Sequence, residues 1–238
     1  MIHPASKLLC LAASAASYYF SFTPPLPAPT TRDEVYKGPF FETIVRRLTY
    51  MSKIFACTML ACEFLVVAAV AYPTTFHRTE TLRTLCYRAV PNSTMLLTPT
   101  PTFLLGFALM ASTAFLRLWC FKTLGNLFTF EVTVRPSHVL VTTGPYAYVR
   151  HPSYTAASLH LVGWFTIHFA SGGWNRECEL MWTQGGKWVA LYFGLSLFSI
   201  ISMWKRGPVE DEGLRKKFGD SWERYRKEVP SMFIPGIW

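Results

Sequence analysis

The sequence predicts an all-α membrane protein, a polytopic transmembrane helical bundle of about five spans with an amphipathic C-terminal helix. Of its 238 residues, 51% are hydrophobic and only 16% are charged, whereas a soluble domain has about 25% charged residues. The apolar residues gather in runs of about 20, the length that crosses a bilayer core. This composition excludes a disordered chain, a fibrous repeat and a secreted disulfide scaffold.

The first apolar segment, residues 8–22, is short and rich in small residues. With Lys7 before it, the segment has the features of a signal peptide, and a short transmembrane helix is the alternative. The proline-rich stretch that follows cannot form a packed element and acts as a stiff linker. We expect a retained helix, because the charge distribution then agrees with five spans.

The other predicted spans are four longer apolar segments, at residues 52–72, 102–121, 155–173 and 186–204. Glu63 lies within the first of them, and His160 and His168 lie on one face of the third. Ionisable residues inside a membrane are expensive and often functional. We expect Glu63 to be a packing or pairing residue, and the two histidines to be buried or to line a cavity.

The distribution of basic residues predicts the orientation. With the N-terminus in the lumen, most Lys and Arg fall in the cytosolic segments 23–51, 122–154 and 205–238, as the positive-inside rule requires. The glycosylation sequon Asn92-Ser93-Thr94 then lies in the lumen. The net charge of +9 is explained by this orientation and by the anionic cytoplasmic leaflet, so no nucleic-acid partner is expected.

The predicted domain division follows from these segments. Residues 1–51 form an N-terminal hydrophobic helix and linker, and residues 52–238 form the transmembrane domain, whose catalytic half is 122–238. The six cysteines form no C-x-x-C pair and lie mostly in apolar runs. We expect buried cysteines, with neither a disulfide nor a metal site.

The C-terminal segment is expected to begin a new helix. Gly207-Pro208 predicts a break after the last span, and Pro208 suits the first turn of a helix over 208–229. That helix would lie on the membrane surface or cap the bundle. Its apolar residues recur at helical spacing, namely Leu214, Phe218, Trp222, Tyr225 and Val229.

Polar residues that could carry chemistry concentrate in two cytosolic segments, 138–154 and 204–212. In the first, Gly144-Pro145 predicts a turn and Pro152 predicts the start of a helix. Arg150, His151 and Tyr154 would then lie at a helix N-terminus, where free N–H groups favour an anion.

In the second segment, Arg206 and Glu210 flank the predicted break, and Arg206 can bind a carboxylate. Taken singly, Arg150 is better explained as a positive-inside anchor and Glu210 as a complement to the helix dipole. Together the two segments predict a membrane enzyme with one polar pocket on its cytosolic face.

Three stretches carry a family resemblance. HVLVTTGPYAYVRHPSY, the later RGPVEDEGLRKKFGDSWERYRKEVP and the upstream LRLWCFKTLGNLFTFEV resemble the isoprenylcysteine carboxyl methyltransferase family. The resemblance covers roughly residues 102–238. Phospholipid N-methyltransferases share the R-H-P and paired-acid patterns, and membrane sterol reductases have a related C-terminal region.

The resemblance implies that S-adenosyl-L-methionine binds without a Rossmann fold, in a pocket built from the C-terminal helices and the tail. Arg206 aligns with the substrate-contacting arginine of the family. Glu131 stands where the family often has Gln, and it and Arg150 are further candidate contacts. The cofactor contacts carry over to His138, Val139, Leu140, Val141, Tyr146, His151, Pro152, Ser153, Tyr154 and Glu210.

The implied reaction is methyl esterification of the C-terminal prenylcysteine carboxylate of prenylated, CaaX-processed proteins, in the endoplasmic reticulum membrane with the active site facing the cytosol. A carboxylate is already nucleophilic, so no general base and no metal are expected. The first alternative is N-methylation of phosphatidylethanolamine, for which Asp211 or Glu212 would accept the ammonium proton. An NADPH-dependent sterol reductase and a non-enzymatic membrane protein are further alternatives.

Overall fold

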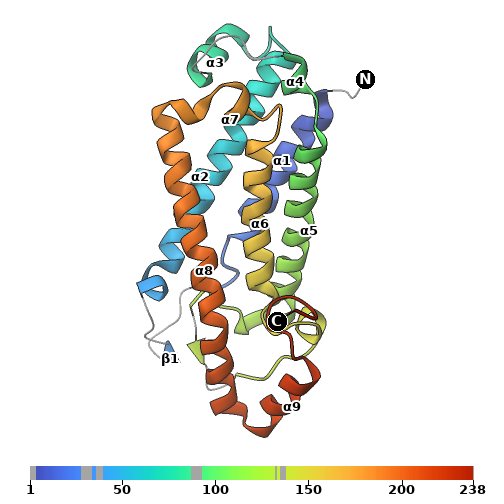
Figure 1. Cartoon of the computed structure of the whole chain (residues 1–238), viewed down its shortest axis with the longest axis vertical. Coiled ribbons are helices and arrows are strands. Elements are labelled where there is room, and N and C mark those ends of the chain that lie inside the picture. Colours follow the sequence, from blue (N-terminus) through green and yellow to red (C-terminus); the bar gives the residue numbers. More distant parts are fainter. Residues whose placement is uncertain are drawn as a thin grey trace. The chain divides into compact units, whose positions relative to one another are not determined.

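A computed structural model describes residues 4–27, 34–35, 40–86, 93–131, 133–134 and 138–237 (Figure 1). The α-helices are α1 (Pro4–Ser21), α2 (Phe40–Ala71), α3 (Arg78–Leu85), α4 (Ser93–Leu97), α5 (Pro101–Leu124), α6 (Pro152–Phe169), α7 (Trp174–Glu177), α8 (Gln184–Phe218) and α9 (Asp220–Glu228). The 3-10 turns are η1 (Gly125–Leu127), η2 (Gly144–Ala147) and η3 (Leu180–Trp182). Two short strands, β1 (Glu34–Val35) and β2 (Thr133–Val134), pair antiparallel, with Glu34 opposite Val134. The predicted helical fold class is confirmed.

Within the described ranges, three helical segments have the length and apolar composition to cross a membrane: Phe40–Ala71, Thr94–Leu127 and Gln184–Phe218. Helices α1 and α6 have 18 residues each, slightly fewer than the roughly 20 that a bilayer core requires. The predicted count of five spans is therefore not confirmed. Asn92 of the predicted sequon lies outside the described residues, as do four of the basic residues used for orientation, Arg32, Lys37, Arg88 and Arg135.

Residue contacts divide the chain into two units, and the helices α2, α5, α6 and α8 contribute residues to both. Unit 1 comprises Met1–Phe20, Ser52–Ser112 and Leu159–Ser196. Unit 2 comprises Ser21–Met51, Thr113–Ser158 and Leu197–Trp238.

Unit 1 is held together by close helix packing. A Cβ atom at Gly106 of α5 would lie 2.9 Å from the carbonyl oxygen of Gly163 in α6, and one at Gly163 would lie 3.0 Å from that of Gly106. Small residues allow such close backbone approach, which is how membrane helices gain packing energy. Trp164 is fully buried beside them, and its indole N–H donates to Ala56 of α2.

His160 and His168 are both fully buried in unit 1, as predicted, and His168 forms a group with Glu63 and Lys7. The Glu63 carboxylate lies 3.0 Å from Nδ1 of His168 and 3.8 Å from Nζ of Lys7. Lys7 also donates to the carbonyl oxygens of Leu96 and Gly172. Glu63 is thus a pairing residue, as predicted, and its partners come from α1 and α6, because only paired charges are tolerated in such an environment.

The prediction that no disulfide forms is wrong. Cys86, which follows α3, and Cys178, which follows α7, form a disulfide in unit 1. The two cysteines are 92 residues apart, and neither belongs to a local motif, so the pairing depends on how the two connecting segments are brought together. The four cysteines at 10, 57, 62 and 120 are free thiols.

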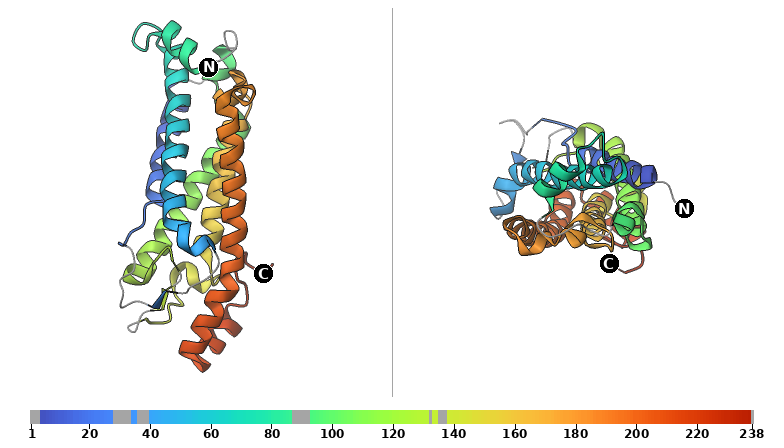
Figure 2. Two further views of the ribbon diagram at one scale, coloured as in Figure 1. Left: turned by 90° about the vertical axis from the view of Figure 1, so that its left-hand side faces the viewer. Right: turned by 90° about the horizontal axis from the view of Figure 1, so that it is seen from above.

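The predicted helix break at Gly207-Pro208 is also wrong. Helix α8 continues through Pro208 to Phe218, and Figure 2 shows it as one long helix. Proline removes one backbone hydrogen bond, usually at a cost of about 3 kcal/mol. Here the ion pair from Arg206 to Glu210 links residues on both sides of Pro208 and stabilises that turn.

Helix α8 ends instead at Gly219, whose φ of +51° favours glycine. The short helix α9 follows and turns its apolar residues back toward α8. The five residues that predicted an amphipathic helix gather in one cluster with Leu140, but they come from two helices: Leu214 and Phe218 from α8, and Trp222, Tyr225 and Val229 from α9 and its end.

Candidate active site

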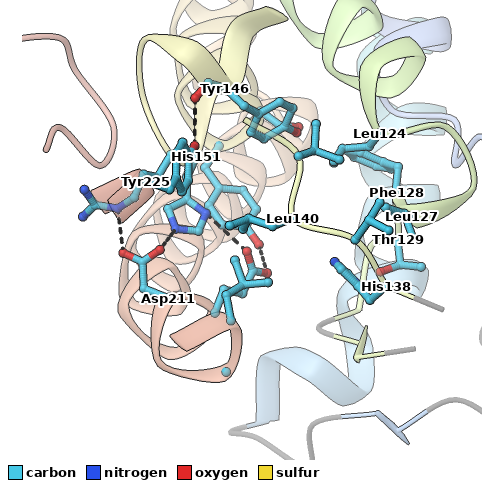
Figure 3. Close-up of a pocket in the computed structure, with 18 of the residues that line it drawn as sticks. Leu124, Leu127, Phe128, Thr129, His138, Leu140, Tyr146, His151, Asp211 and Tyr225 are labelled. Carbon is cyan, nitrogen blue, oxygen red and sulfur yellow. Dashed lines mark hydrogen bonds and ion pairs between the residues drawn. The ribbon is translucent and has the colours of Figure 1, made fainter. Parts of the chain in front are cut away.

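Unit 2 contains a pocket between the two predicted polar segments. Its wall includes residues from the end of α5 through Glu131, from 138–141, from the start of α6 and from the last turns of α8 (Figure 3). Leu124, Leu127 and Phe128 lie on one side, and His151 and Asp211 lie on the other. The lining residues are Leu124, Leu127, Phe128, Thr129, Glu131, His138, Val139, Leu140, Val141, Tyr146, Arg150, His151, Ser153, Tyr154, Glu210, Asp211, Gly213, Leu214 and Tyr225.

The approach to α6 has the local structure that the sequence predicts. Gly144 has a φ of +60° and opens the turn η2, and a Cβ there would lie 3.0 Å from Oγ1 of Thr123. Tyr225 of α9 donates to the carbonyl oxygen of Tyr146 at 2.8 Å and fixes the turn from the other side. Pro152 is the first residue of α6, so the polar residues before it are held at the helix start.

His151 is the centre of the polar side of the pocket. Its Nε2 lies 3.0 Å from Oδ1 of Asp211, and its Nδ1 lies 3.3 Å from Oε2 of Glu210. Burial alone would lower the pKa of His151, but the hydrogen bonds to Asp211 and Glu210, together with their charges, raise it to about 9. His151 is therefore a buried imidazolium at neutral pH, donating to a carboxylate from each nitrogen.

Asp211 uses its second oxygen for Arg150. Nε of Arg150 donates to Oδ2 of Asp211 at 3.0 Å, and Nη1 donates to the carbonyl oxygens of Val229 and Pro230. Asp211 thus joins Arg150, His151 and the C-terminal tail, and this hydrogen-bonded set is almost fully buried.

The tail, residues 229–234, packs against the start of α6. The backbone N–H of Arg150 donates to the carbonyl oxygen of Ser231 at 3.1 Å, and that of His151 donates to the carbonyl oxygen of Met232 at 2.8 Å. The Thr155 hydroxyl donates to the carbonyl oxygen of Phe233. The N–H groups just before α6 are therefore bonded to the tail, whereas the sequence suggested that they would be free for an anion.

Glu210 connects His151 to the region of Arg206. Its Oε1 accepts a hydrogen bond from the Tyr154 hydroxyl and another, of 3.1 Å, from Nε of Arg206. Arg206 also lies 3.3 Å from Glu42 of α2 and donates to the carbonyl oxygen of Phe130 at 2.6 Å. Arg206 is buried and is not among the residues that line the pocket.

Glu131, the departure from the family pattern, is held by an arginine that was not predicted as its partner. Arg46 of α2 donates to both carboxylate oxygens, at 2.8 Å and 2.9 Å. Burial alone would raise the pKa of Glu131, but the hydrogen bonds and charge of Arg46 lower it. The carboxylate is thus kept ionised at the pocket edge.

The side chains that form ion pairs in and around the pocket have equal numbers of positive and negative charges. Four cations (Arg46, Arg150, His151 and Arg206) face four carboxylates (Glu42, Glu131, Glu210 and Asp211). Two ligands of opposite net charge can then bind together without changing the net charge of the pocket, which keeps the cost of burying them low.

The predicted site residues are largely brought together. Of the thirteen candidates, eleven line the pocket. The other two are Pro152, which starts α6, and Arg206, which is buried and pairs with Glu210. Two features of the site were not predicted from the sequence: Asp211 as the link between Arg150 and His151, and the apolar wall formed by Leu124, Leu127 and Phe128. Asp211 could have been found from its place beside Glu210, but the wall depends on a turn at the end of α5.

Comparisons with known proteins agree with the predicted resemblance. The model of the isoprenylcysteine carboxyl methyltransferase (ICMT) family matches residues 104–170. The chain is 34% identical over 136 residues to a protein-S-isoprenylcysteine O-methyltransferase of Schizosaccharomyces pombe (strain 972 / ATCC 24843), covering 55% of this chain and 48% of that protein. It is 35% identical over 117 residues to a protein-S-isoprenylcysteine O-methyltransferase of Dictyostelium discoideum, covering 48% of this chain and 41% of that protein.

The chain spans about half the length of the curated relatives that it matches. The family match ends within α6, so it includes the apolar wall of the pocket and the segment from His138 to Tyr154. The resemblance predicted from the sequence is confirmed: the chain is similar to isoprenylcysteine carboxyl methyltransferases over the segment that builds the first half of this pocket.

Proposed function

We propose that the protein is an S-adenosyl-L-methionine-dependent methyltransferase that esterifies the C-terminal prenylcysteine carboxylate of prenylated proteins. The observation that carries this proposal is the convergence of the two resemblance-bearing segments, 138–154 and 206–211, on one pocket. The similarity to two protein-S-isoprenylcysteine O-methyltransferases supports the reaction.

The residues of the pocket fit the proposed methyl donor. Leu124, Leu127, Phe128 and Leu140 offer an apolar wall to a planar base. Glu131 and Glu210 offer carboxylates to an amine and a sulfonium. When bound, S-adenosyl-L-methionine would supply an electrophilic methyl group next to these side chains.

The acceptor carboxylate needs orientation and a dry site, and it needs no base. Its attack on a sulfonium methyl group neutralises both charges, and water would stabilise the charged reactants more than the transition state. Arg206 is the candidate to hold this carboxylate, which would then compete with Glu42 and Glu210 for the guanidinium.

The paired acids argue against the lipid amine as acceptor. N-methylation requires a group that takes a proton from an ammonium. Both oxygens of Asp211 already accept from cations, and Glu210 accepts from Tyr154, Arg206 and His151. Both carboxylates are therefore already engaged by donors and cations and are poorly placed to take a proton from an ammonium.

The proposal extends to location and to the division of the chain. Residues 122–238 would form the catalytic half, and residues 1–51 an N-terminal helix and linker. The protein would be a multi-pass membrane protein of the endoplasmic reticulum with its pocket toward the cytosol, where S-adenosyl-L-methionine is supplied. The excess of basic residues in segments 23–51, 122–154 and 205–238 supports this orientation.

The test supplies methyl-labelled S-adenosyl-L-methionine to membranes that contain the protein, with N-acetyl-S-farnesylcysteine or phosphatidylethanolamine as the acceptor. We expect base-labile label on the farnesylcysteine and none with an Arg206→Ala variant. Label only on the lipid amine would overturn prenylcysteine as the acceptor and support S-adenosyl-L-methionine as the methyl donor. No binding of S-adenosyl-L-methionine to the folded protein would overturn the proposed function.

A further inference from the structure

Arg117 is a buried cation within the upstream stretch LRLWCFKTLGNLFTFEV, and the resemblance assigned it no role. It belongs to the last part of α5 and has only 6% of its surface exposed. Its Nε donates to the carbonyl oxygen of Ser21 at 2.6 Å. Its Nη1 donates to the carbonyl oxygen of Ser153 at 3.0 Å and to the hydroxyl of Ser153 at 2.8 Å.

Aromatic rings surround the same guanidinium. Its central carbon lies 5.2 to 6.0 Å from the ring centres of four phenylalanines, Phe22, Phe121, Phe128 and Phe130. Cation–π attraction of this kind is stronger when the cation is desolvated. The rings and the three hydrogen bonds together offset the cost of burying the charge, and they fix the guanidinium plane.

Arg117 therefore joins two parts of the pocket. Ser153, in the first turn of α6, lines the polar side of the pocket, and Phe128 lines the apolar wall. Phe121, Phe128 and Phe130 form one buried cluster. A single side chain thus sets the position of this wall relative to the first turn of α6.

The hydrogen bond to Ser153 also decides what the hydroxyl can do. A serine hydroxyl has one hydrogen to donate, and an acceptor lone pair used by Arg117 cannot accept from a ligand. Because Oγ accepts from Nη1, the hydroxyl hydrogen is directed to a different neighbour, and Ser153 faces the pocket. Donation from Arg117 also polarises the hydroxyl and makes it a better donor.

An anionic acceptor suits this position best. Ser153 lies in the first turn of α6, where the helix dipole is positive, and the Arg117 guanidinium adds a full positive charge behind it. The carboxylates Glu131, Glu210 and Asp211 also line the pocket and would repel an anion placed beside them. The lining cations Arg150 and His151 are already paired with Asp211 and Glu210, so the Ser153 hydroxyl is the favoured place for a ligand carboxylate.

We propose that Arg117 is a positioning residue that makes the Ser153 hydroxyl a hydrogen-bond donor to the carboxylate of the methionine part of S-adenosyl-L-methionine. This inference rests on the proposed function, because it takes S-adenosyl-L-methionine as the ligand. It adds a residue that reaches the ligand only through Ser153, together with the chemical group that Ser153 recognises.

The experiment compares binding of S-adenosyl-L-methionine with binding of its decarboxylated analogue, by calorimetry on the purified full chain in lipid nanodiscs. The wild type is expected to bind the decarboxylated analogue roughly tenfold more weakly, as one charge-assisted hydrogen bond predicts. Ser153→Ala and Arg117→Gln should each weaken binding of S-adenosyl-L-methionine by a similar factor and leave binding of the analogue nearly unchanged. The affinity of the double variant for S-adenosyl-L-methionine should be no lower than the lower of the two single-variant affinities, because the two residues act on one contact.

Matched controls are available in the chain. Ser112 is exposed on α5 and Arg83 is exposed on α3. The variants Ser112→Ala and Arg83→Gln should leave the affinities for S-adenosyl-L-methionine and for its decarboxylated analogue unchanged. Arg117→Lys keeps the charge without the planar fork, and we expect it to restore part of the lost affinity.

Other results would overturn the proposal. Equal loss of both ligands in Arg117→Gln would assign the residue a structural role only, and if that variant does not fold, Ser153→Ala still tests the ligand contact. Equal binding of the two ligands by the wild type would show that the ligand carboxylate makes no such contact, and it would leave the proposed methyltransferase function standing. Binding of neither ligand by the wild type would overturn the proposed function and this role with it.

Discussion

Asp211 and His151 are 60 residues apart in the chain and are joined by a buried hydrogen bond of 3.0 Å. The bond connects the last turns of α8 to the residue before α6, and the second oxygen of Asp211 extends it to Arg150. One carboxylate therefore holds together the two segments that carry the family resemblance.

Replacing this carboxylate should weaken the whole polar side of the pocket. Asp211→Asn keeps the shape but removes the negative charge between His151 and Arg150. Breaking a buried ion pair costs about 3 to 5 kcal/mol when one partner is removed, and we expect a lower midpoint of thermal unfolding together with at least tenfold weaker binding of S-adenosyl-L-methionine. Glu212→Gln, an exposed acid one residue further on, is the control, and equal effects of the two would contradict this assignment.

The charge of His151 predicts how stability depends on pH. Its pKa is raised from 6.5 to about 9 in the folded protein, so its contribution is complete below about pH 6.5 and is lost as the pH rises through about 9. The expected loss is on the order of 3 kcal/mol. Thermal unfolding of the wild type and of His151→Gln, measured between pH 6 and pH 10, should show a decline that the variant lacks; parallel profiles would contradict the buried imidazolium.

Glu42 is expected to compete with the acceptor for Arg206. It lies 3.3 Å from Nε of Arg206 and comes from α2, so its carboxylate occupies part of the guanidinium that a substrate carboxylate would need. Glu42→Gln should lower the KM for N-acetyl-S-farnesylcysteine several-fold and leave the KM for S-adenosyl-L-methionine unchanged. A higher KM for the acceptor would mean that Glu42 supports Arg206 instead of competing for it.

Gly207 is required by the tail. A Cβ at this position would lie 2.7 Å from Cζ of Phe233 and 3.1 Å from Sδ of Met232, and Phe233 is held by stacking on Trp204. Gly207→Ala should displace the tail at a cost of about 1 to 3 kcal/mol, with faster proteolysis of the C-terminus. Gly194→Ala on the same helix meets no atom within 4 Å and should be neutral. Unchanged stability and proteolysis of Gly207→Ala would show that the tail can move to accept the methyl group at no measurable cost.

The disulfide gives a test of orientation. Cys86 and Cys178 lie in the connections after α3 and after α7, which the charge distribution assigns to the lumen, and disulfides persist in oxidising compartments. In microsomes the two thiols should be blocked until a reductant that crosses the membrane is added, and Cys86→Ser with Cys178→Ser should cost about 2 to 4 kcal/mol. Free thiols that react from the cytosolic side would reverse the orientation.

Several features were predictable because they depend on nearby residues. Gly144-Pro145 and Pro152 give the turn and the start of α6, since backbone conformation at glycine and proline is decided locally. The helices also follow from the apolar runs. The break expected at Pro208 failed because the ion pair from Arg206 to Glu210 and the contacts of that turn outweigh the local preference of proline.

The sequence was sufficient to predict a helical chain, apolar segments long enough to span a membrane and two segments rich in polar residues, because hydrophobicity and turn preference are properties of short stretches. The partners of the buried charges depend on the folded chain: Asp211 pairs with His151 and Arg150, Glu42 with Arg206, Arg46 with Glu131, and Arg117 donates to Ser153. A buried charge needs a partner at hydrogen-bond distance, and these partners lie 36 to 164 residues away, so no local pattern selects them.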